Sequence, residues 1–462
     1  MANPLPSTVG SLTFREVELA LPGGAAPVIG DLRIEDGVIT AVGLVDRSAG
    51  EVVDGRGLTL MPGVIDPQVH FREPGHEHKE DLATGSAAAA AGGVTAFLEM
   101  PNTAPPTTTR ALVLDKHARA TGRCRAHWGF FLGATPDNQD TLAREALAPL
   151  VCGLKIFMGS STGTLLVDDP EALEAHFAIT DAAAHSVPIA VHAEDETRLR
   201  ALKAARGSEP PPTVCEHPRL RDPEAALIAT RRAVALAEKH ARRLHILHLG
   251  TAEEAAYLAG RPRDGLVTSE TLPQYLWLDD RDYERMGTRV QMNPPVREAR
   301  HGQALWAALH AGVIDCLATD HAPHTLDEKA KPYGQAPSGM PGVETLLPLM
   351  LHALSLGKCT LEELVRWLCE APARCYGLVG KGRLAVGADG DVVLINRRAA
   401  RTLRDTDSLS RCGWTPYAGW TLTGWPVMTV LRGRPVYRGG QFLDAVWGEP
   451  LRFERAVAPA GA

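Results

Sequence analysis

The sequence of 462 residues lacks several features that mark particular classes of protein. No block of basic residues stands out, and 48 Lys and Arg residues against 55 Asp and Glu residues give a net charge of −7. We therefore expect no nucleic-acid partner, because phosphates are bound by clustered positive charge. The eight cysteines form no Cys-x-x-Cys pair, which predicts reduced and mostly buried thiols.

Long apolar runs are also missing. No segment offers the roughly 20 consecutive apolar residues that a membrane span requires, and residues 1–24 lack the charged start and apolar core of a secretory signal. We therefore expect no membrane partner and a cytoplasmic location. Internal repeats and low-complexity linkers are absent too, so this length predicts one large domain or two ordinary ones.

What the sequence does contain is a series of short apolar segments that alternate with longer Ala- and Leu-rich stretches from residue 58 onward. Helices are expected at 81–91, 170–184, 223–240 and 302–311. The alternation predicts an α/β fold, a closed parallel (β/α)8 barrel of the TIM type, because parallel strands need helical crossovers. An open doubly wound sheet has the same alternation, but no Gly-x-Gly-x-x-Gly follows an early strand. The predicted strands lie within 58–70, 94–102, 127–133, 153–159, 187–194, 244–251, 266–273 and 314–324.

The two ends of the chain have a different pattern. They carry short strand-like runs punctuated by Gly, Asp and Pro, as at 38–42, 391–395 and 427–431. Because these runs flank the predicted barrel on both sides, we expect them to pair as one small β domain built from both termini. The predicted division assigns residues 1–57 and 384–462 to the β domain and residues 58–383 to the barrel.

Chemically active side chains fall near the ends of five predicted barrel strands, where the βα loops of a barrel converge. They are His70, Lys155, His192, His248 and Asp320. One such residue alone is more often structural, but imidazoles and a carboxylate on one rim suit Zn²⁺ or a similar divalent ion. A lysine in an apolar strand is costly to bury as an ammonium. As a carbamate formed with CO2 it would be an anion that bridges two cations; the alternative is a side chain that reaches out to the barrel rim.

With these motifs in place, the sequence resembles the cyclic amidohydrolases and, within them, the class I type of dihydroorotases. The resemblance runs from MPGVID at 61–66 through SGMPGVET at 338–345 and into GRLAVGAD at 382–389. It implies a centre of one or two zinc ions with Lys155 as a carboxylated bridging ligand. It further implies that His192 and His248 bind one zinc, and that His70 and Asp320 bind the other.

The resemblance also implies substrate contacts beside the metal centre. Arg72 carries a planar guanidinium suited to a carboxylate, and allantoinases and hydantoinases generally lack the Arg-Glu-Pro-Gly run at 72–75 as a whole. The other implied contacts are Asn102, Asn293, His324 and the backbone at Gly339. The residues alone leave alternatives open: a salt bridge at the rim for Arg72, and turn positions beside prolines for the two asparagines.

Two positions depart from the family pattern. The family has His-x-His at the end of the first strand, whereas this chain has Gln68-Val69-His70. A glutamine amide oxygen can bind a divalent ion, but it is a weaker and neutral donor than imidazole for zinc. The run PQYL at 273–276 also departs, since related chains often have histidine soon after that proline. Both changes bear on the occupancy of one metal position.

The activity that the resemblance implies is zinc-dependent, reversible hydrolysis of the ring amide of dihydroorotate to N-carbamoyl-L-aspartate, a step of pyrimidine biosynthesis. Asp320 would accept and return the proton. Gln68 leaves open a second hypothesis, a catalytically silent subunit that partners aspartate transcarbamoylase. A third is an active amidohydrolase for another cyclic ureide, such as allantoin or a hydantoin. A homo-oligomer is the other expected assembly.

Overall fold

Parallel strands form the centre of the structure, a computed structural model that describes residues 10–45, 50–161, 163–208 and 210–455. The outer ends of both terminal segments, 1–9 and 456–462, lie outside these ranges. Six strands pair in the order β14-β13-β12-β11-β10-β9, and three more pair in the order β6-β7-β8. The strands are β6 Val64–Val69, β7 Val94–Glu99, β8 His127–Phe130, β9 Leu132–Gly133, β10 Leu154–Phe157, β11 Ile189–His192, β12 Leu244–Ile246, β13 Val267–Thr271 and β14 Cys316–Leu317.

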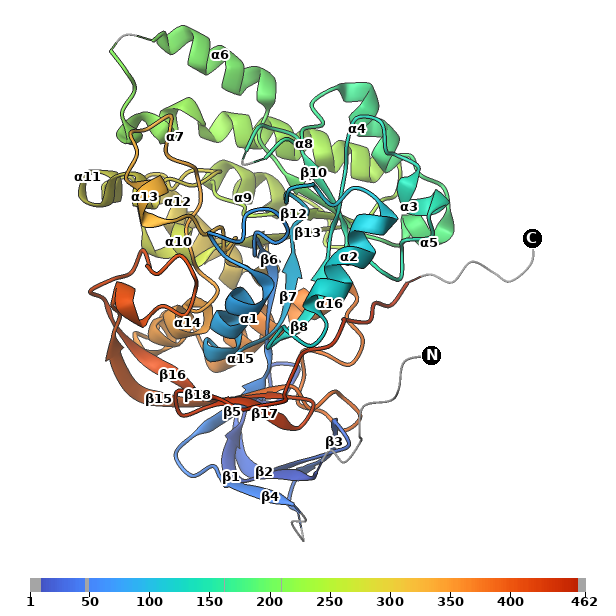
Figure 1. Cartoon of the computed structure of the whole chain (residues 1–462), viewed down its shortest axis with the longest axis vertical. Helices are drawn as coiled ribbons and strands as arrows, with labels where there is room; N and C mark the ends of the chain where they lie inside the picture. Colours follow the sequence, from blue (N-terminus) through green and yellow to red (C-terminus); the bar gives the residue numbers. More distant parts are fainter. Residues whose placement is uncertain (1–9, 46–49, 162, 209, 456–462) are drawn as a thin grey trace.

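The two sheets join at both edges. Only Phe131 separates β8 from β9, and Val69 of β6 forms a parallel bridge with His321, shortly after β14. The strands therefore close into a ring, with helices packed around it (Figure 1). This confirms the predicted (β/α)8 barrel, and each predicted strand segment contains the corresponding barrel strand.

Local capping residues explain where the helices begin. Asp81 precedes α1 (Leu82–Ala91) and accepts a hydrogen bond from the Thr84 backbone N–H, and Asp222 caps α8 (Pro223–Lys239) in the same way. The single helix predicted at 170–184 is wrong. The structure has α4 (Pro170–Phe177) and α5 (Ala182–His185), because the Asp181 side chain caps a new helix start.

The remaining helices cover the outside of the barrel and its loops. The helix predicted at 302–311 begins three residues earlier, as α12 (Ala299–His310). The others are α2 Arg110–Ala120, α3 Thr141–Arg144, α6 Glu196–Arg206, α7 His217–Leu220, α9 Ala252–Ala259, α10 Pro273–Trp277, α11 Asp282–Met286, α13 Leu326–Lys329, α14 Leu346–Ser355, α15 Leu361–Val365 and α16 Ala371–Tyr376.

A second sheet is built from both ends of the chain, and its blue and red strands lie together at one end of the molecule (Figure 1). The order is β18-β17-β16-β15-β5-β1-β2-β3, with β4 beside β1. Only Gly63 separates β5 of this sheet from β6 of the barrel, while the division of the chain into two domains stays a prediction. The strands are β1 Leu12–Leu19, β2 Val28–Glu35, β3 Val38–Gly43, β4 Glu51–Asp54, β5 Thr59–Pro62, β15 Val392–Thr402, β16 Thr421–Leu431, β17 Arg434–Arg438 and β18 Gln441–Phe442.

A buried carboxylate joins the sheet to the barrel. Asp391 accepts hydrogen bonds from His127 Nε2 of β8 at 3.1 Å and from the Arg432 backbone N–H at 2.8 Å. Its other carboxylate oxygen pairs with the Lys381 ammonium, and its backbone carbonyl accepts from the Gly63 N–H. Burial raises the pKa of this carboxyl, but the Lys381 charge and the His127 contact hold it well below the usual range.

Two further expectations concern the whole described chain. All eight cysteines are free thiols, and every one except Cys215 is buried, as the sequence predicts. Within the described ranges, none of the helices combines the length and the apolar character needed to cross a membrane.

Candidate metal and active site

A pocket at the C-terminal ends of the barrel strands brings together the predicted site residues. Every predicted site residue except His324 is among the described residues that line this pocket. The lining is made by Gln68, His70, Arg72, Asn102, Lys155, Phe157, Ser161, His192, His248, Asn293, Asp320, Ala322, Ser338 and Gly339. The carboxyl ends of the strands are where a barrel places its variable loops, so this is the position expected for a reactive site.

His192 and His248, from neighbouring strands β11 and β12, present ring nitrogens to each other. His192 Nδ1 lies 3.1 Å from His248 Nε2. The other nitrogen of His192, Nε2, lies 2.9 Å from Glu194 Oε2. Burial raises the pKa of Glu194, but Arg221 and His192 more than offset this and keep it a carboxylate, with Arg221 Nε 3.1 Å away. His192 Nε2 therefore carries the proton, and the Nδ1 lone pair faces His248.

This arrangement fits a divalent cation. Burial lowers the pKa of His192 and lowers that of His248 well below its usual range, so both rings are neutral ligands at neutral pH. Two nitrogens bound at about 2.0–2.1 Å to one tetrahedral zinc lie about 3.3 Å apart, close to the observed separation. The carboxylate behind His192 is the partner that typically orients a metal-binding imidazole.

Lys155 of β10 lies in the same pocket and is 1% exposed. Burial lowers the pKa of its ammonium to about 7, against the opposing charges of Asp320 and Glu270. A substantial fraction of Lys155 is then a neutral amine at neutral pH, which is the form that reacts with CO2. The barrel thus supplies the nucleophilic lysine that a bridging carbamate requires.

The first and last barrel strands contribute a hydrogen-bonded group around Asp320. Asp320 Oδ1 lies 2.9 Å from His70 Nε2 and accepts from Gln68 Nε2 at 3.1 Å. His70 Nδ1 lies 2.7 Å from Asn102 Oδ1, so it donates there, and the Nε2 lone pair faces Asp320 Oδ1, as two ligands of one cation would. Gln68 Oε1 is buried without a partner in the described structure. It is therefore available as the weak neutral donor that replaces the family histidine.

Three residues of the site have a left-handed backbone. The φ angles are 64° at Arg72, 38° at His248 and 46° at Asp320. Side chains other than those of Gly, Asn and Asp rarely adopt this region, and such residues cluster where function fixes a side-chain direction. The strand ends are thus bent where their side chains meet.

Arg72 is held in the pocket wall by residues that follow β14. Its Nε donates to the Pro323 carbonyl at 3.1 Å, and its Nη2 lies 3.1 Å from His324 Nε2. His324 is completely buried, and its Nδ1 lies 3.1 Å from the Lys79 ammonium. Burial lowers the pKa of Arg72 to about 10, so it stays cationic at neutral pH. The predicted substrate contact His324 thus lies behind Arg72 and positions it.

The loops that carry Asn293 and Gly339 are tied together by Lys329. Its Nζ donates to the carbonyls of Gln291, Pro337 and Gly339 at 3.0, 2.9 and 2.9 Å. The Gly339 N–H donates to the Gln291 carbonyl, so both backbone groups of Gly339 have partners within the protein. A Cβ at Gly339 would lie 2.5 Å from the Ala322 carbonyl oxygen. Asn293 Oδ1, by contrast, is buried in the described structure without a partner.

Sequence reasoning missed Glu194, Ser161 and Lys329. Glu194 had a usable signal, because it follows His192 by two residues, as a carboxylate that orients a ligand often does. Ser161 lies in a loop, and Lys329 ends the short helix α13 far along the chain. Their roles come from tertiary contacts that no local pattern reports.

The comparisons with known proteins agree with this geometry. A model of the Amidohydrolase family matches residues 59–436, and the chain belongs to that family. It is an amidohydrolase, which confirms the resemblance seen in the sequence.

Relatives named for three different activities resemble the chain over most of its length. The chain is 38% identical over 410 residues to a dihydroorotase of Halobacterium salinarum, covering 88% of this chain and 93% of the relative. It is 34% identical over 436 residues to an allantoinase of Rubrobacter xylanophilus, covering 92% and 95%. The solved L-hydantoinase of Arthrobacter aurescens superposes with a TM-score of 0.90 at 29% identity, over 96% of this chain and 99% of that one.

Proposed function

We propose that the protein is a dihydroorotase, which hydrolyses the ring amide of dihydroorotate to N-carbamoyl-L-aspartate and catalyses the reverse reaction in pyrimidine biosynthesis. The observation that carries this proposal is the position of Arg72, whose buried cationic guanidinium lines the same pocket as Lys155 and the histidines. Dihydroorotate presents a carboxylate beside its ring amide, so one cation opposite a hydrolytic centre matches its shape.

Two pocket residues would orient the ring. Arg72 is fixed by Pro323 and His324, so it is already aligned when a carboxylate arrives. The partnerless Oδ1 of Asn293 is an acceptor for a ring N–H. A substrate carboxylate on Arg72 and a ring N–H on Asn293 would leave the amide carbonyl facing the strand ends.

The residues that would hold zinc are His70, Lys155, His192, His248 and Asp320, with a carboxylated Lys155 bridging two ions where both are bound. A bound divalent ion lowers the pKa of water from about 15.7 toward roughly 7 and polarises the scissile carbonyl. Gln68, with its weaker amide donor, makes the position beside His70 and Asp320 the weaker of the two.

Asp320 would carry the proton. Its Oδ1 accepts a hydrogen bond from Gln68 Nε2 and lies 2.9 Å from His70 Nε2, so its carboxylate has a fixed position in the pocket. It would take a proton from the attacking water and deliver it to the leaving ring nitrogen, and it would run the same transfers backward in the direction of ring closure.

The test is steady-state turnover of dihydroorotate and of N-carbamoyl-L-aspartate, with zinc analysis on the same sample. Asp320→Asn should lower kcat by about 10²–10⁴-fold, whereas Asp137→Asn, at an exposed loop position, should leave it unchanged. Turnover that survives Asp320→Asn would contradict the assignment.

A second candidate is an enzyme for another cyclic ureide, favoured by the allantoinase relative and the hydantoinase structure. Arg72→Met separates the two. It should raise the KM for dihydroorotate about 10-fold or more, because a charge-assisted contact is worth roughly 1.5–3 kcal/mol, and leave the KM for hydantoin, which has no carboxylate, nearly unchanged. Better turnover of allantoin or hydantoin than of dihydroorotate would favour this candidate.

Gln68 favours the third candidate, a silent subunit that partners aspartate transcarbamoylase. Against it, the pocket residues all come from one chain and the remaining donors are in place. We propose instead an active cytoplasmic enzyme, alone or as a homo-oligomer, and its free buried thiols fit a reducing compartment. Absence of turnover on all three substrates, together with co-purification with aspartate transcarbamoylase, would establish the silent subunit.

A further inference from the structure

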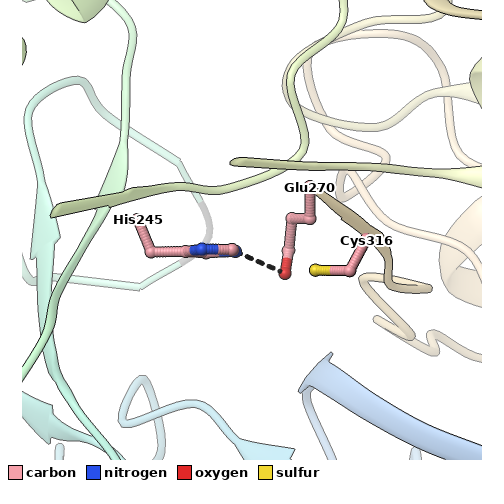
Figure 2. A group of neighbouring side chains, drawn as sticks. All are labelled: His245, Glu270 and Cys316. Atoms are coloured by element: carbon pink, nitrogen blue, oxygen red, sulfur yellow. Dashed lines mark hydrogen bonds and ion pairs between the residues drawn. The ribbon is translucent and has the colours of Figure 1, made fainter. Parts of the chain in front are cut away.

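A polar group lies in the interior of the barrel, apart from the pocket lining. His245 of β12, Glu270 of β13 and Cys316 of β14 come from three neighbouring strands, and the sheet register places Glu270 opposite Cys316. Each is fully buried. One donor atom from each lies within 4.8 Å of the others, and the three side chains converge in Figure 2. The proposed reaction uses none of them.

A second cysteine joins this group from outside the strands. Cys375 belongs to α16, and its thiol interacts with both Cys316 and His245. It packs in the same interior cluster as Ala190 and Leu247. The Cys375 thiol therefore lies beside the three converging donors, next to the Cys316 thiol and the His245 imidazole, in an otherwise apolar environment.

The hydrogen bonds fix which nitrogen of His245 faces the group. The Thr268 hydroxyl donates to the Leu244 carbonyl at 3.2 Å, so its oxygen accepts from His245 Nδ1 at 2.8 Å. This leaves Nε2 pointing at Glu270 Oε2, 3.0 Å away. An imidazole held by its other ring nitrogen is the usual preparation of a metal ligand.

Two readings account for the contact between His245 and Glu270. A proton shared between them gives a buried ion pair, but this leaves Glu270 Oε1 without a partner in the described structure. A cation uses all four groups. The nitrogen–oxygen separation is also near the roughly 3.4 Å expected for two ligands of one tetrahedral zinc at about 2.0–2.2 Å each.

We propose that His245, Glu270, Cys316 and Cys375 form a structural site for one zinc ion, separate from the catalytic pocket. Two sulfur donors with an imidazole and a carboxylate select Zn²⁺ over Mg²⁺ or Ca²⁺, which prefer oxygen ligands. Both cysteines would bind as thiolates, the form in which cysteine ligates a metal.

The site would fasten α16 to three adjacent strands of the barrel. Glu270 also interacts electrostatically with Lys155, so the ion would lie beneath the pocket and hold the strands that present His248 and Asp320. Its expected effect is on stability and on the shape of the strand ends, with no direct contact to substrate.

Cobalt substitution tests this proposal without reference to turnover. Cobalt bound to thiolate gives an intense near-ultraviolet charge-transfer absorption, and the described pocket lining contains no cysteine, so that absorption does not come from the catalytic pocket. The cobalt-loaded wild-type protein should show it. Cys316→Ser and Cys375→Ser should each abolish it, and Cys124→Ser, a buried cysteine elsewhere, should preserve it.

Lys155→Ala separates the two sites. It should weaken metal binding in the catalytic pocket and leave the thiolate absorption intact. The double variant Cys316→Ser/Cys375→Ser should bind one zinc ion fewer per chain and unfold at a lower temperature than Cys124→Ser. If the cysteine variants do not fold, the spectrum of the cobalt-loaded wild-type protein still shows whether a thiolate binds the metal. A cobalt-loaded wild-type protein without thiolate absorption, or one whose absorption survives both serine substitutions, overturns the proposal.

Discussion

Three histidines of the barrel are oriented by a polar group behind the ring. His192 is held by Glu194, His70 by Asn102, and His245 by Thr268. In each case the outer contact settles which nitrogen keeps its lone pair, and that nitrogen faces the neighbouring donors. The outer partners therefore decide what the imidazoles can bind, although none of them need touch an ion or a substrate.

Glu194→Gln should weaken zinc binding about 10–100-fold, since outer-shell partners of ligating histidines have effects of that size. The amide removes the negative charge that holds the His192 proton and leaves Arg221 without its carboxylate partner. Competition with a calibrated chelator measures the change. Glu196→Gln is the matched control, because Glu196 contacts Ser160 and Arg200 instead. Equal affinities for the two variants would contradict the role of Glu194.

Gln68→His should increase zinc binding at the position beside His70 and Asp320. The change replaces an amide that donates to Asp320 with an imidazole that can bind the ion directly. Zinc per chain after dialysis against a weak chelator should rise relative to the wild type. An unchanged ratio would show that Gln68 is not what limits occupancy.

The sequence indicates which of these residues lie close together, because they are at strand ends, which periodicity reveals. His70, Lys155, His192, His248 and Asp320 all line the pocket. The sequence could not show that His324 is buried behind Arg72, or that Lys329 reaches two loops. Those contacts depend on how distant loops fold over one another, and no local signal encodes them.

Among the secondary-structure elements, the transition from sheet to barrel is abrupt. β5 ends at Pro62 and β6 begins at Val64, and a Cβ at Gly63 would lie 2.1 Å from Thr95 Oγ1. The run at 58–70 predicted a single barrel strand because both strands are fully buried, although Pro62-Gly63 between them is a turn signal. The long helix expected at 170–184 has a similar cause: its composition favours helix throughout, but the Asp181 side chain starts a new one.

Asp391→Asn should destabilise the protein by about 3–5 kcal/mol at neutral pH, the usual cost of removing one partner of a buried ion pair. It leaves the Lys381 ammonium with one carboxylate, Asp389, and weakens the His127 contact. Urea unfolding monitored by fluorescence measures the difference. Asp389→Asn, which retains the His127 pair, should cost less, and the reverse order would contradict this account.

The effect should depend on pH. Because the folded pKa of Asp391 lies below its unfolded value, the stabilisation is fully present above the unfolded pKa of about 3.9 and is lost as the pH falls toward the folded pKa. The gap in stability between wild type and Asp391→Asn should therefore shrink in acid.

On the scale of the whole molecule, the first and last strands of the described chain are interleaved in one sheet. β5 pairs with β1 from the N-terminal side and with β15 from the C-terminal side, and it continues into the barrel through Gly63. The N-terminal and C-terminal halves of that sheet cannot separate without unpairing β5, the strand that continues into the barrel. The sheet and the barrel should therefore lose their structure together.

Differential scanning calorimetry should accordingly show one unfolding transition, whose calorimetric and van't Hoff enthalpies agree. A near-ultraviolet signal from Trp414, next to the barrel loops, and one from Trp425 of β16 in the terminal sheet should change at the same temperature. Two resolved transitions would show that the terminal sheet unfolds independently.

The contacts of Lys329 affect how the substrate specificity of the enzyme can be altered. Its single ammonium donates to the Gln291 carbonyl, in the loop that carries Asn293. It also donates to the carbonyls of Pro337 and Gly339, on either side of Ser338. Substitutions in either loop shift the same three hydrogen bonds, so their effects will not add. Transplanting one loop from a relative with another specificity would leave this ammonium with mismatched carbonyls. A change of substrate specificity by loop exchange therefore requires both loops and Lys329 to be transferred together.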